Sequence, residues 1–145
     1  MDRILILADR DHSAAELAAT LRVAGFETHL VDSAEAARSE LAASAIDAIV
    51  IDLDLRALRG ARGLSLAREV RTAYPSTRVM LTSTSLLTQR QLERTDCGAV
   101  VFLPKPFDLA RAPGLVRECL DCCSEHVRRL WHAQGAAPVS SSYSL

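Results

Sequence analysis

Short apolar runs alternate along this chain with segments in which apolar residues recur every three or four positions. The run from Ile4 to Ala8 has no polar position, which is typical of a strand buried on both faces of a sheet. The run from Glu27 to Val31 is half polar and fits the edge of a sheet better. The sequence predicts five strands: Ile4–Ala8, Glu27–Val31, Ile46–Ile51, Arg78–Leu81 and Ala99–Leu103.

A predicted helix follows each strand. The first carries Leu17 and Leu21 on one face and ends before Gly25, a residue that commonly terminates helices. The others are a second from Ser33, a third over residues 64–74, a fourth over 86–95 and a last one that begins at Leu109 or Leu115 and ends at Trp131. Strands that alternate with helices of this length require right-handed crossovers and a parallel sheet with helices on both faces. We therefore expect an α/β fold with a five-stranded parallel sheet in the order 2-1-3-4-5.

Charged side chains follow three of these strands at the carboxyl end: Asp9, Asp52 and Lys105, the last held between Pro104 and Pro106. Parallel strands share one carboxyl edge, and such sheets bind ligands there, at the point where the strand order reverses. The three side chains are therefore expected to converge. Two carboxylates and an ammonium group suit a Mg²⁺ ion and a phosphoryl group.

Length and charge narrow the function further. The 145 residues predict a single domain over 1–132, with an extended last helix, and a disordered Ser-rich tail over 133–145 that is too short to form an output domain. The net charge of −1 provides no basic field for nucleic acid. No apolar stretch approaches the ~20 residues of a membrane helix, and the first apolar run is too short for a signal peptide. We expect a soluble cytoplasmic protein that binds neither nucleic acid nor membrane.

The four cysteines do not predict a disulfide framework, because three of them crowd one predicted helix and Cys97 lies in another segment. Cys119, Cys122 and Cys123 share that helix with His126. They are either part of a metal site or small core-facing residues. A single helix does not easily surround a tetrahedral ion, which favours the second interpretation.

The motifs Ile4 to Asp9, Ile49 to Asp52, Val79 to Ser83 and Lys105 to Phe107 carry a resemblance to a known family. Over residues 3–123 the chain resembles the receiver domain of bacterial two-component response regulators. The resemblance implies the (βα)5 receiver fold and a Mg²⁺ ion at the carboxyl edge. It assigns Asp52 as phosphoacceptor, Asp9, Asp52 and the backbone carbonyl of Asp54 as metal ligands, Lys105 as the phosphoryl contact, and Thr82 and Phe102 as switch residues. It also implies a cis bond between Lys105 and Pro106, an isomer found almost only before proline.

The same resemblance implies a function. A histidine kinase or a histidine phosphotransfer protein would donate a phosphoryl group to Asp52, and the phosphorylated chain would change its contacts with a downstream protein target. Homodimerisation through the face of helix 4, strand 5 and helix 5 belongs to the same expectation. Such a stand-alone receiver is a signalling protein and not an enzyme, since it catalyses only its own phosphorylation and dephosphorylation.

The chain departs from the family pattern in three places. Ala8 replaces the first of two adjacent acids, so we expect weakened Mg²⁺ binding; Asp11 either compensates in part or caps the first helix. The segment 53–63 is longer than in the family and carries Arg56, Arg59 and Arg62. Either it is a solvated loop, or one of its arginines screens the phosphoryl group or contacts a donor protein. The last helix carries apolar residues in a 4-3-4-3 spacing: Val116, Leu120, Cys123, Val127 and Leu130. This spacing indicates either a helix face that packs on its own sheet or a face that docks a partner.

Three other functions compete with this expectation. A receiver-like module that no longer accepts phosphate is suggested by Ala8 and the altered loop. A haloacid-dehalogenase-type phosphatase is suggested by Asp52 and Asp54, as nucleophile and acid/base, although those enzymes carry the nucleophile on their first strand. A dinucleotide-binding module is disfavoured, because acids occupy the position of the glycine-rich turn.

Overall fold

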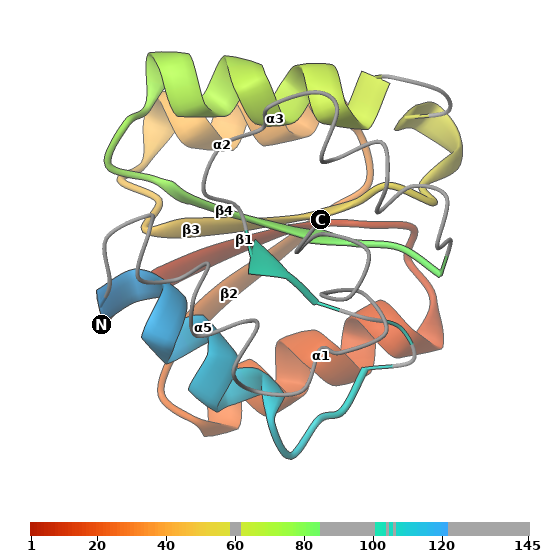
Figure 1. The fold of residues 1–145 in the computed structure, drawn as a ribbon, viewed down its shortest axis with the longest axis vertical. Helices are drawn as coiled ribbons and strands as arrows, with labels where there is room; N and C mark the ends of the chain where they lie inside the picture. The colour runs from red at the N-terminus through yellow and green to blue at the C-terminus, as the bar shows by residue number, and fades with distance from the viewer. Residues whose placement is uncertain (59–61, 85–100, 104, 106, 122–145) are drawn as a thin grey trace, which may run out of the picture.

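The computed structural model describes residues 1–58, 62–84, 101–103, 105 and 107–121. These residues form a layered α/β structure with a parallel sheet between two pairs of helices (Figure 1). The elements are β1 (Arg3–Leu7), α1 (His12–Val23), β2 (Glu27–Val31), α2 (Ala34–Ala43), β3 (Ala48–Asp52), the short 3-10 helix η1 (Arg56–Leu58), α3 (Arg62–Ala73), β4 (Arg78–Thr82), β5 (Val101–Phe102) and α5 (Ala112–Asp121).

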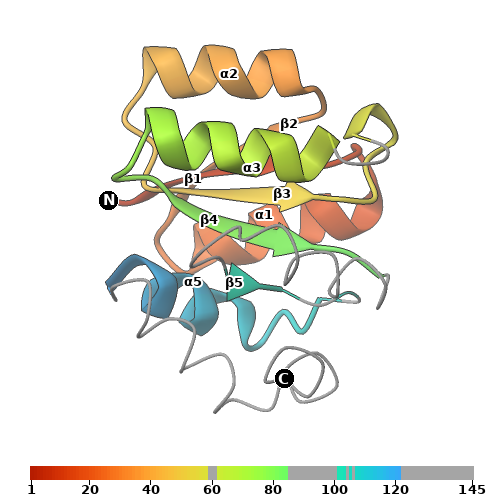
Figure 2. The same cartoon turned by 45° about the horizontal axis from the view of Figure 1, so that its top comes forward.

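The sheet order is β2-β1-β3-β4-β5, with every neighbouring pair parallel. Both views place α2 and α3 on one face and α1 and α5 on the other (Figures 1 and 2). Successive side chains of a strand point to opposite faces, so each strand supplies both cores. In β1, Leu5 and Leu7 pack under α2 and α3, whereas Ile4 and Ile6 pack under α1 and α5. The predicted α/β parallel fold is confirmed.

Individual elements differ from the prediction at their ends. The central strand β3 is completely buried and includes Asp52, one residue later than expected. The fifth strand pairs only Val101 and Phe102 with β4. The predicted helix over 86–95, the start of the predicted fifth strand and the last helix beyond Asp121 lie outside the described residues.

The described part of α5 favours packing on its own sheet. Val116 and Cys119 are buried in the core under α1 and α5, and Leu120 packs against it. For Cys119 the core-facing interpretation is therefore confirmed. The other cysteines, His126 and the rest of the 4-3-4-3 pattern lie outside the described residues. Among the described helices, none is long and apolar enough to cross a lipid bilayer.

Gly25 and Gly114 provide a matched test of the backbone. Gly25 has φ +102°, whereas Gly114 lies within α5, and a Cβ atom at either position meets nothing within 4 Å. We expect Gly25→Ala to lower the free energy of unfolding by about 1–2 kcal/mol, because only the positive φ penalises the new side chain. Gly114→Ala is expected to raise it by up to about 1 kcal/mol, since alanine favours helix. Urea unfolding measures the free energy of both variants. A Gly25→Ala chain as stable as the unsubstituted one would contradict the positive φ at this position.

Candidate functional site

The carboxyl ends of the strands bring chemically active residues to one edge. Asp52 is the last residue of β3 and pairs with Thr82, the last residue of β4. Leu7 at the end of β1 pairs with Ile51, so the segment that follows β1 runs out beside Asp52. The backbone N–H of Leu103 donates to the carbonyl of Leu81, which sets the direction of the chain toward Lys105.

Lys105 forms an ion pair with Asp52. Its Nζ lies 2.6 Å from Asp52 Oδ2 and 3.6 Å from Asp54 Oδ2. The side chains of Lys105 and Asp52 are only 16% and 5% exposed, so water screens the pair little. The other Asp52 oxygen, Oδ1, accepts the backbone N–H of Asp54 at 2.8 Å. The predicted convergence of Asp52 and Lys105 is therefore seen. Lys105 is also the chain's only lysine; all its other basic residues apart from histidine are arginines.

Asp54 makes contacts that the sequence did not predict. Its Oδ1 accepts the hydroxyl of Ser83 at 2.8 Å, and its Oδ2 accepts the backbone N–H of Thr84 at 2.9 Å and the Thr84 hydroxyl at 3.2 Å. The carboxylate thus ties the loop after β3 to the loop after β4. The sequence contains a signal for this contact. Two hydroxyl residues, Ser83 and Thr84, follow the fourth strand, and the acid Asp54 lies two positions after Asp52 at the end of the neighbouring strand.

The two carboxyl groups have pKa values shifted in opposite directions. Burial raises the pKa of Asp52, and this outweighs the hydrogen bond from Lys105, the backbone N–H of Asp54 and the charge of Lys105. Burial also acts to raise the pKa of Asp54, but the hydrogen bonds from Thr84 and Ser83 and the charge of Lys105 together hold it below its usual range. The lowered pKa favours the ionised form of Asp54, whereas the general acid of a phosphatase needs a pKa that is raised.

Thr82 carries a buried hydroxyl that has no hydrogen-bond partner among the described residues. The residue is 1% exposed, and its Oγ1 has no hydrogen bond to any described residue. A buried hydroxyl left unpaired costs about 1–3 kcal/mol. By strand register it lies across from Asp52, so an oxygen-rich group attached to that carboxylate would satisfy it.

Asp9 lies at the same edge, two residues beyond the end of β1, and its side chain forms no hydrogen bond or ion pair with another described residue. The carboxylates of Asp9 and Asp52 and the backbone carbonyl of Asp54 are hard oxygen donors, the type that Mg²⁺ prefers, and Mg²⁺ usually keeps several waters. Ala8, buried in the core under α1 and α5, contributes no oxygen. Within the described ranges, no three acidic, histidine or cysteine side chains gather closely enough to hold a metal by themselves. These oxygen atoms are of the type that Mg²⁺ binds, and the metal site itself stays a prediction.

The remaining sequence predictions fall as follows. Asp11 is the N-cap of α1, and its carboxylate accepts the N–H of Ala14 at 2.9 Å, so the capping interpretation is confirmed. Phe102 lies in β5 opposite Leu81, and its switch role stays a prediction. Arg59 and the bond to Pro106 lie outside the described residues.

In the described part of the chain, neither Arg56 nor Arg62 forms a hydrogen bond or ion pair with Asp52. Arg56 is exposed in η1, and Arg62 begins α3. The salt bridge that the described residues make with Asp52 comes from Lys105. Screening of the site by these two arginines is therefore not seen.

Comparison with known proteins places this fold and site in a family. The profile of the response regulator receiver domain matches residues 4–117, and the chain belongs to that family. It is 28% identical over 135 residues to regulatory protein AtoC of Escherichia coli (strain K12), covering 92% of this chain and 29% of AtoC. It is 32% identical over 124 residues to response regulator protein FleR of Pseudomonas aeruginosa, covering 86% of this chain and 24% of FleR. The chain thus spans less than a third of either relative.

Solved structures agree on the fold. A crystal structure of a response regulator from Thermotoga maritima superimposes with a TM-score of 0.74 at 20% identity, covering 84% of this chain and 99% of that one. Receiver domains are signalling domains of two-component systems; phosphorylation on aspartate and Mg²⁺ binding at an acidic pocket are general properties of the family.

The opposite pKa shifts predict opposite effects of neutral substitutions on stability. Because the pKa of Asp52 is raised, its ionisation favours the unfolded chain. The stability that the protonated carboxyl group contributes in acid is therefore lost as pH rises from the ordinary carboxyl pKa through the raised pKa of the folded chain. Asp52→Asn is therefore expected to raise the free energy of unfolding at neutral pH, with the gain vanishing in acid. Asp54 stabilises the fold above the ordinary carboxyl pKa and loses this effect as pH falls through its lowered value, so Asp54→Asn is expected to destabilise.

Urea unfolding of both variants and the unsubstituted chain between acid and neutral pH tests this pair. Each variant controls for the other, because both remove one carboxylate from the same edge. If both substitutions changed the free energy of unfolding at neutral pH in the same direction, the opposite pKa shifts of Asp52 and Asp54 would be contradicted.

Proposed function

We propose that this chain is a response-regulator receiver that accepts a phosphoryl group on the side chain of Asp52 and thereby changes its contacts with other proteins. The observation that supports this proposal is the Asp52–Lys105 ion pair, in which the Nζ of Lys105 lies 2.6 Å from Oδ2 of Asp52. An ammonium group held at this distance neutralises the carboxylate and is in place to bind a phosphoryl oxygen.

The proposed transfer is a direct displacement. A carboxylate oxygen of Asp52 attacks the phosphorus of a phosphohistidine or a small acyl phosphate, and the bond from phosphorus to the leaving nitrogen or oxygen breaks with its electron pair on the leaving group. Lys105 then pairs with an oxygen of the transferred phosphoryl group. The unpaired hydroxyl of Thr82 provides a further hydrogen bond, and its movement toward Asp52 would open space for Phe102.

The proposed metal is Mg²⁺, bound by Asp9, Asp52 and the backbone carbonyl of Asp54. When bound, it would supply positive charge that reduces the repulsion between the carboxylate and the phosphoryl group. Because Ala8 contributes no oxygen, we propose that the affinity for Mg²⁺ is weakened.

The proposed donor is a histidine kinase or a histidine phosphotransfer protein, since receiver domains interact with histidine kinases and with downstream effector domains. We propose that the phosphorylated chain contacts a downstream protein target. A homodimer through helix 4, strand 5 and helix 5 is a separate proposal. Direct nucleic-acid binding is not part of the proposal. Action as a stand-alone domain in the cytoplasm also stays a proposal, because the curated relatives extend well beyond the matched region.

A second candidate is a receiver-like module that acts without phosphorylation. One observation favours it: Ala8 is buried and replaces one of the acids expected at the metal site. Its fold and its partner surfaces would be the same, and its contacts would depend on binding alone.

Intact-mass measurement after incubation with acetyl phosphate distinguishes the two. We expect the chain to gain one phosphate group in the presence of Mg²⁺, to gain none with a chelator, and to gain none as Asp52→Asn. An unchanged mass at every Mg²⁺ concentration would support the module that acts without phosphorylation.

A further inference from the structure

One carboxylate holds the segment that follows β4. The side chain of Asp54 accepts the hydroxyl of Ser83 at 2.8 Å through Oδ1, and the backbone N–H and hydroxyl of Thr84 at 2.9 and 3.2 Å through Oδ2. One residue earlier, the backbone N–H of Leu53 donates to the carbonyl of Thr82 at 2.8 Å. The last residue of β4 and the two that follow it are therefore tied to the loop after β3.

Asp54 is also connected to the ion pair at the carboxyl edge. Its backbone N–H donates to Asp52 Oδ1 at 2.8 Å, and its Oδ2 lies 3.6 Å from Lys105 Nζ. The same Nζ lies nearer to Asp52, at 2.6 Å from Oδ2. One ammonium group thus faces two carboxylates, so a change of charge at Asp52 also changes how well Lys105 shields Asp54.

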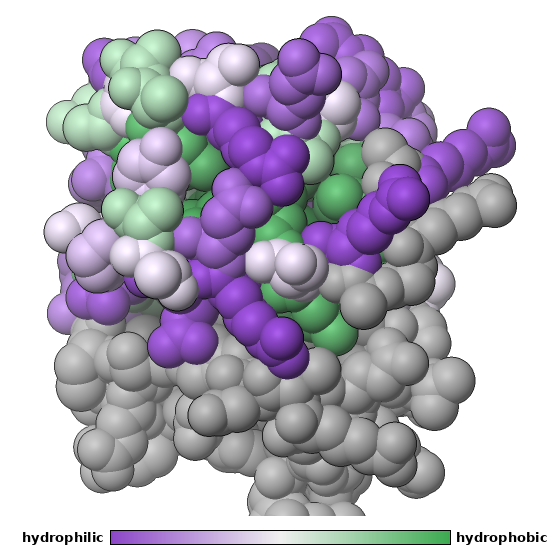
Figure 3. All heavy atoms as spheres, turned by 90° about the horizontal axis from the view of Figure 1, so that it is seen from above, coloured by the Kyte–Doolittle hydropathy of each residue, from purple (hydrophilic) through white to green (hydrophobic). Residues whose placement is uncertain are grey.

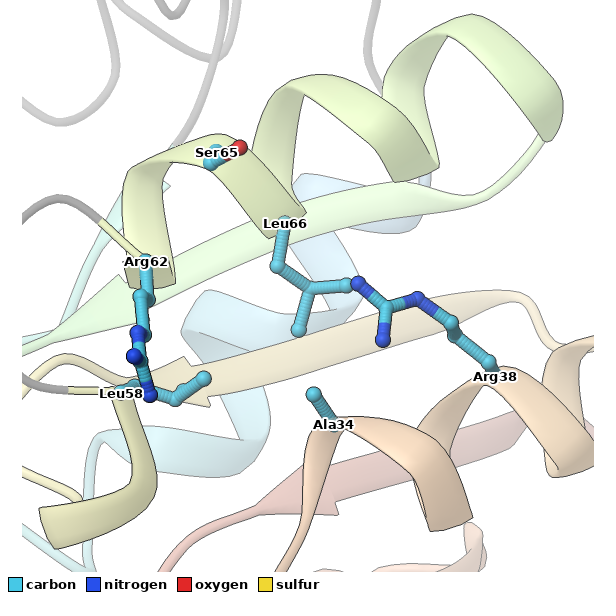
Figure 4. A pocket seen from close by; sticks show the side chains of 6 residues that line it. All are labelled: Ala34, Arg38, Leu58, Arg62, Ser65 and Leu66. Atoms are coloured by element: carbon cyan, nitrogen blue, oxygen red, sulfur yellow. The ribbon is translucent and has the colours of Figure 1, made fainter.

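The contacts of Asp54 are less exposed than the ion pair between α2 and α3. Hydrophilic side chains gather over the face that these two helices form (Figure 3). There Arg38 extends from α2 toward α3 (Figure 4), and it pairs with Glu69; the two side chains are 52% and 47% exposed. Exposed pairs of this kind contribute little. The Asp54 side chain is 33% exposed, and its hydrogen bonds are assisted by its charge, which makes them roughly twice as strong as neutral ones.

Phosphorylation of Asp52 would weaken this hold. A phosphorylated side chain carries about two negative charges, whereas the free carboxylate carries one. In the proposed function Lys105 pairs with a phosphoryl oxygen, so it would shield Asp54 less. The carboxylate of Asp54 would then be repelled by the phosphoryl group and would hold the loop after β4 less strongly.

We propose that Asp54 is a positioning residue for the response to phosphorylation, because its carboxylate holds Ser83 and Thr84 in place in the unphosphorylated chain. Loss of this hold lets the hydroxyl of Thr82, which has no partner among the described residues, turn toward Asp52. The inference rests on the proposed function and deepens it, since the acceptor acts on the loop after β4 through a neighbouring carboxylate.

The test compares amide NMR shifts of ¹⁵N-labelled full chains in a chelator, with no phosphoryl donor present. Asp54→Asn keeps the size of the side chain and removes its charge, and it is expected to raise the ratio of released to held loop about tenfold. The amide signals of Thr82, Val101 and Phe102 are expected to move as a result. Ser83→Ala removes one contact from the other side and is expected to move the same signals in the same direction.

Asp11→Asn is the matched control. The carboxylate of Asp11 also accepts a backbone N–H at 2.9 Å, from Ala14, and the described contacts do not join it to the loop after β4. This substitution is expected to leave the signals of β4 and β5 in place. Phosphorylation of the unsubstituted chain, compared with the unphosphorylated chain at the same Mg²⁺ concentration, is expected to move those signals further in the direction that Asp54→Asn moves them.

The outcomes keep the two proposals apart. Loss of a merely local contact would move signals near residue 54 and not those of β5, so β5 signals that stay in place in Asp54→Asn would overturn the positioning role. Movement in another direction on phosphorylation would also overturn it. A chain that gains no phosphate would contradict the proposed function alone. Whether Asp54 holds the loop is then decided by the displacement that Asp54→Asn and Ser83→Ala share.

Discussion

Replacing Lys105 by alanine is expected to slow phosphorylation by acetyl phosphate about a hundredfold. Removing one preorganised charge or donor from a transition state typically costs a factor of about 10²–10³ in rate. Lys105 is the cation that the described structure places beside Asp52, the proposed acceptor, with its Nζ 2.6 Å from Asp52 Oδ2. The rate is measured by intact mass against time at saturating Mg²⁺, and Lys105→Arg is the matched control because it keeps the charge.

The same substitution is expected to destabilise the fold. Lys105→Ala leaves the Asp52 carboxylate, the more deeply buried partner at 5% exposure against 16% for Lys105, without its cation, and an unpaired buried charge costs about 3 kcal/mol or more at neutral pH. The loss is expected to shrink in acid, because Asp52, whose pKa burial already raises, then takes up a proton. A Lys105→Ala chain that is phosphorylated as fast as the unsubstituted chain would show that the pair has no part in transfer.

Replacing Thr82 by valine is expected to stabilise the unphosphorylated chain, by about 1 kcal/mol. The hydroxyl is buried without a partner, so its removal ends a desolvation cost and loses no hydrogen bond among the described residues. Thr77→Val is the matched control. The Thr77 hydroxyl donates to the carbonyl of Ile46 at 2.7 Å, so its loss is expected to destabilise by about 1–3 kcal/mol.

The two threonines also separate stability from signalling. In the phosphorylated chain, Thr82→Val is expected to remove a phosphoryl contact and with it the amide NMR shifts that spread from β4 to β5. Thr77→Val is expected to leave those shifts in place. A destabilising Thr82→Val would mean that the hydroxyl already has a partner in the unphosphorylated state.

The parts of the fold that follow from simple rules could be predicted from the sequence. An uninterrupted apolar run identified β1 as an interior strand, and a half-polar run identified β2 as an edge strand. The meeting of Asp52 with Lys105 followed from strand direction, because parallel strands end at one edge. Strand ends were less certain, since Asp52 itself extends β3 through its backbone pairing with Thr82.

The hydroxyl residues after Thr82 were a signal for contacts with Asp54, but the hydrogen bonds themselves could not be predicted, because they depend on how two loops approach each other. Ser83 and Thr84 are distant from Asp54 in sequence, and no strand register connects their side chains. The place of Arg62 was not predictable either. The sequence put this residue in the long loop after β3, whereas the structure begins α3 at Arg62 (Figure 4).

The proposed function requires phosphorylation at Asp52 and at no other carboxylate of the carboxyl edge. Hydroxylamine cleaves an acyl phosphate and leaves a hydroxamate on the residue that carried it, so peptide mass spectrometry after treatment with acetyl phosphate, Mg²⁺ and hydroxylamine locates the acceptor directly. We predict a single hydroxamate, at Asp52. A hydroxamate at Asp9 or Asp54 in its place, or none despite saturating Mg²⁺, would contradict the account.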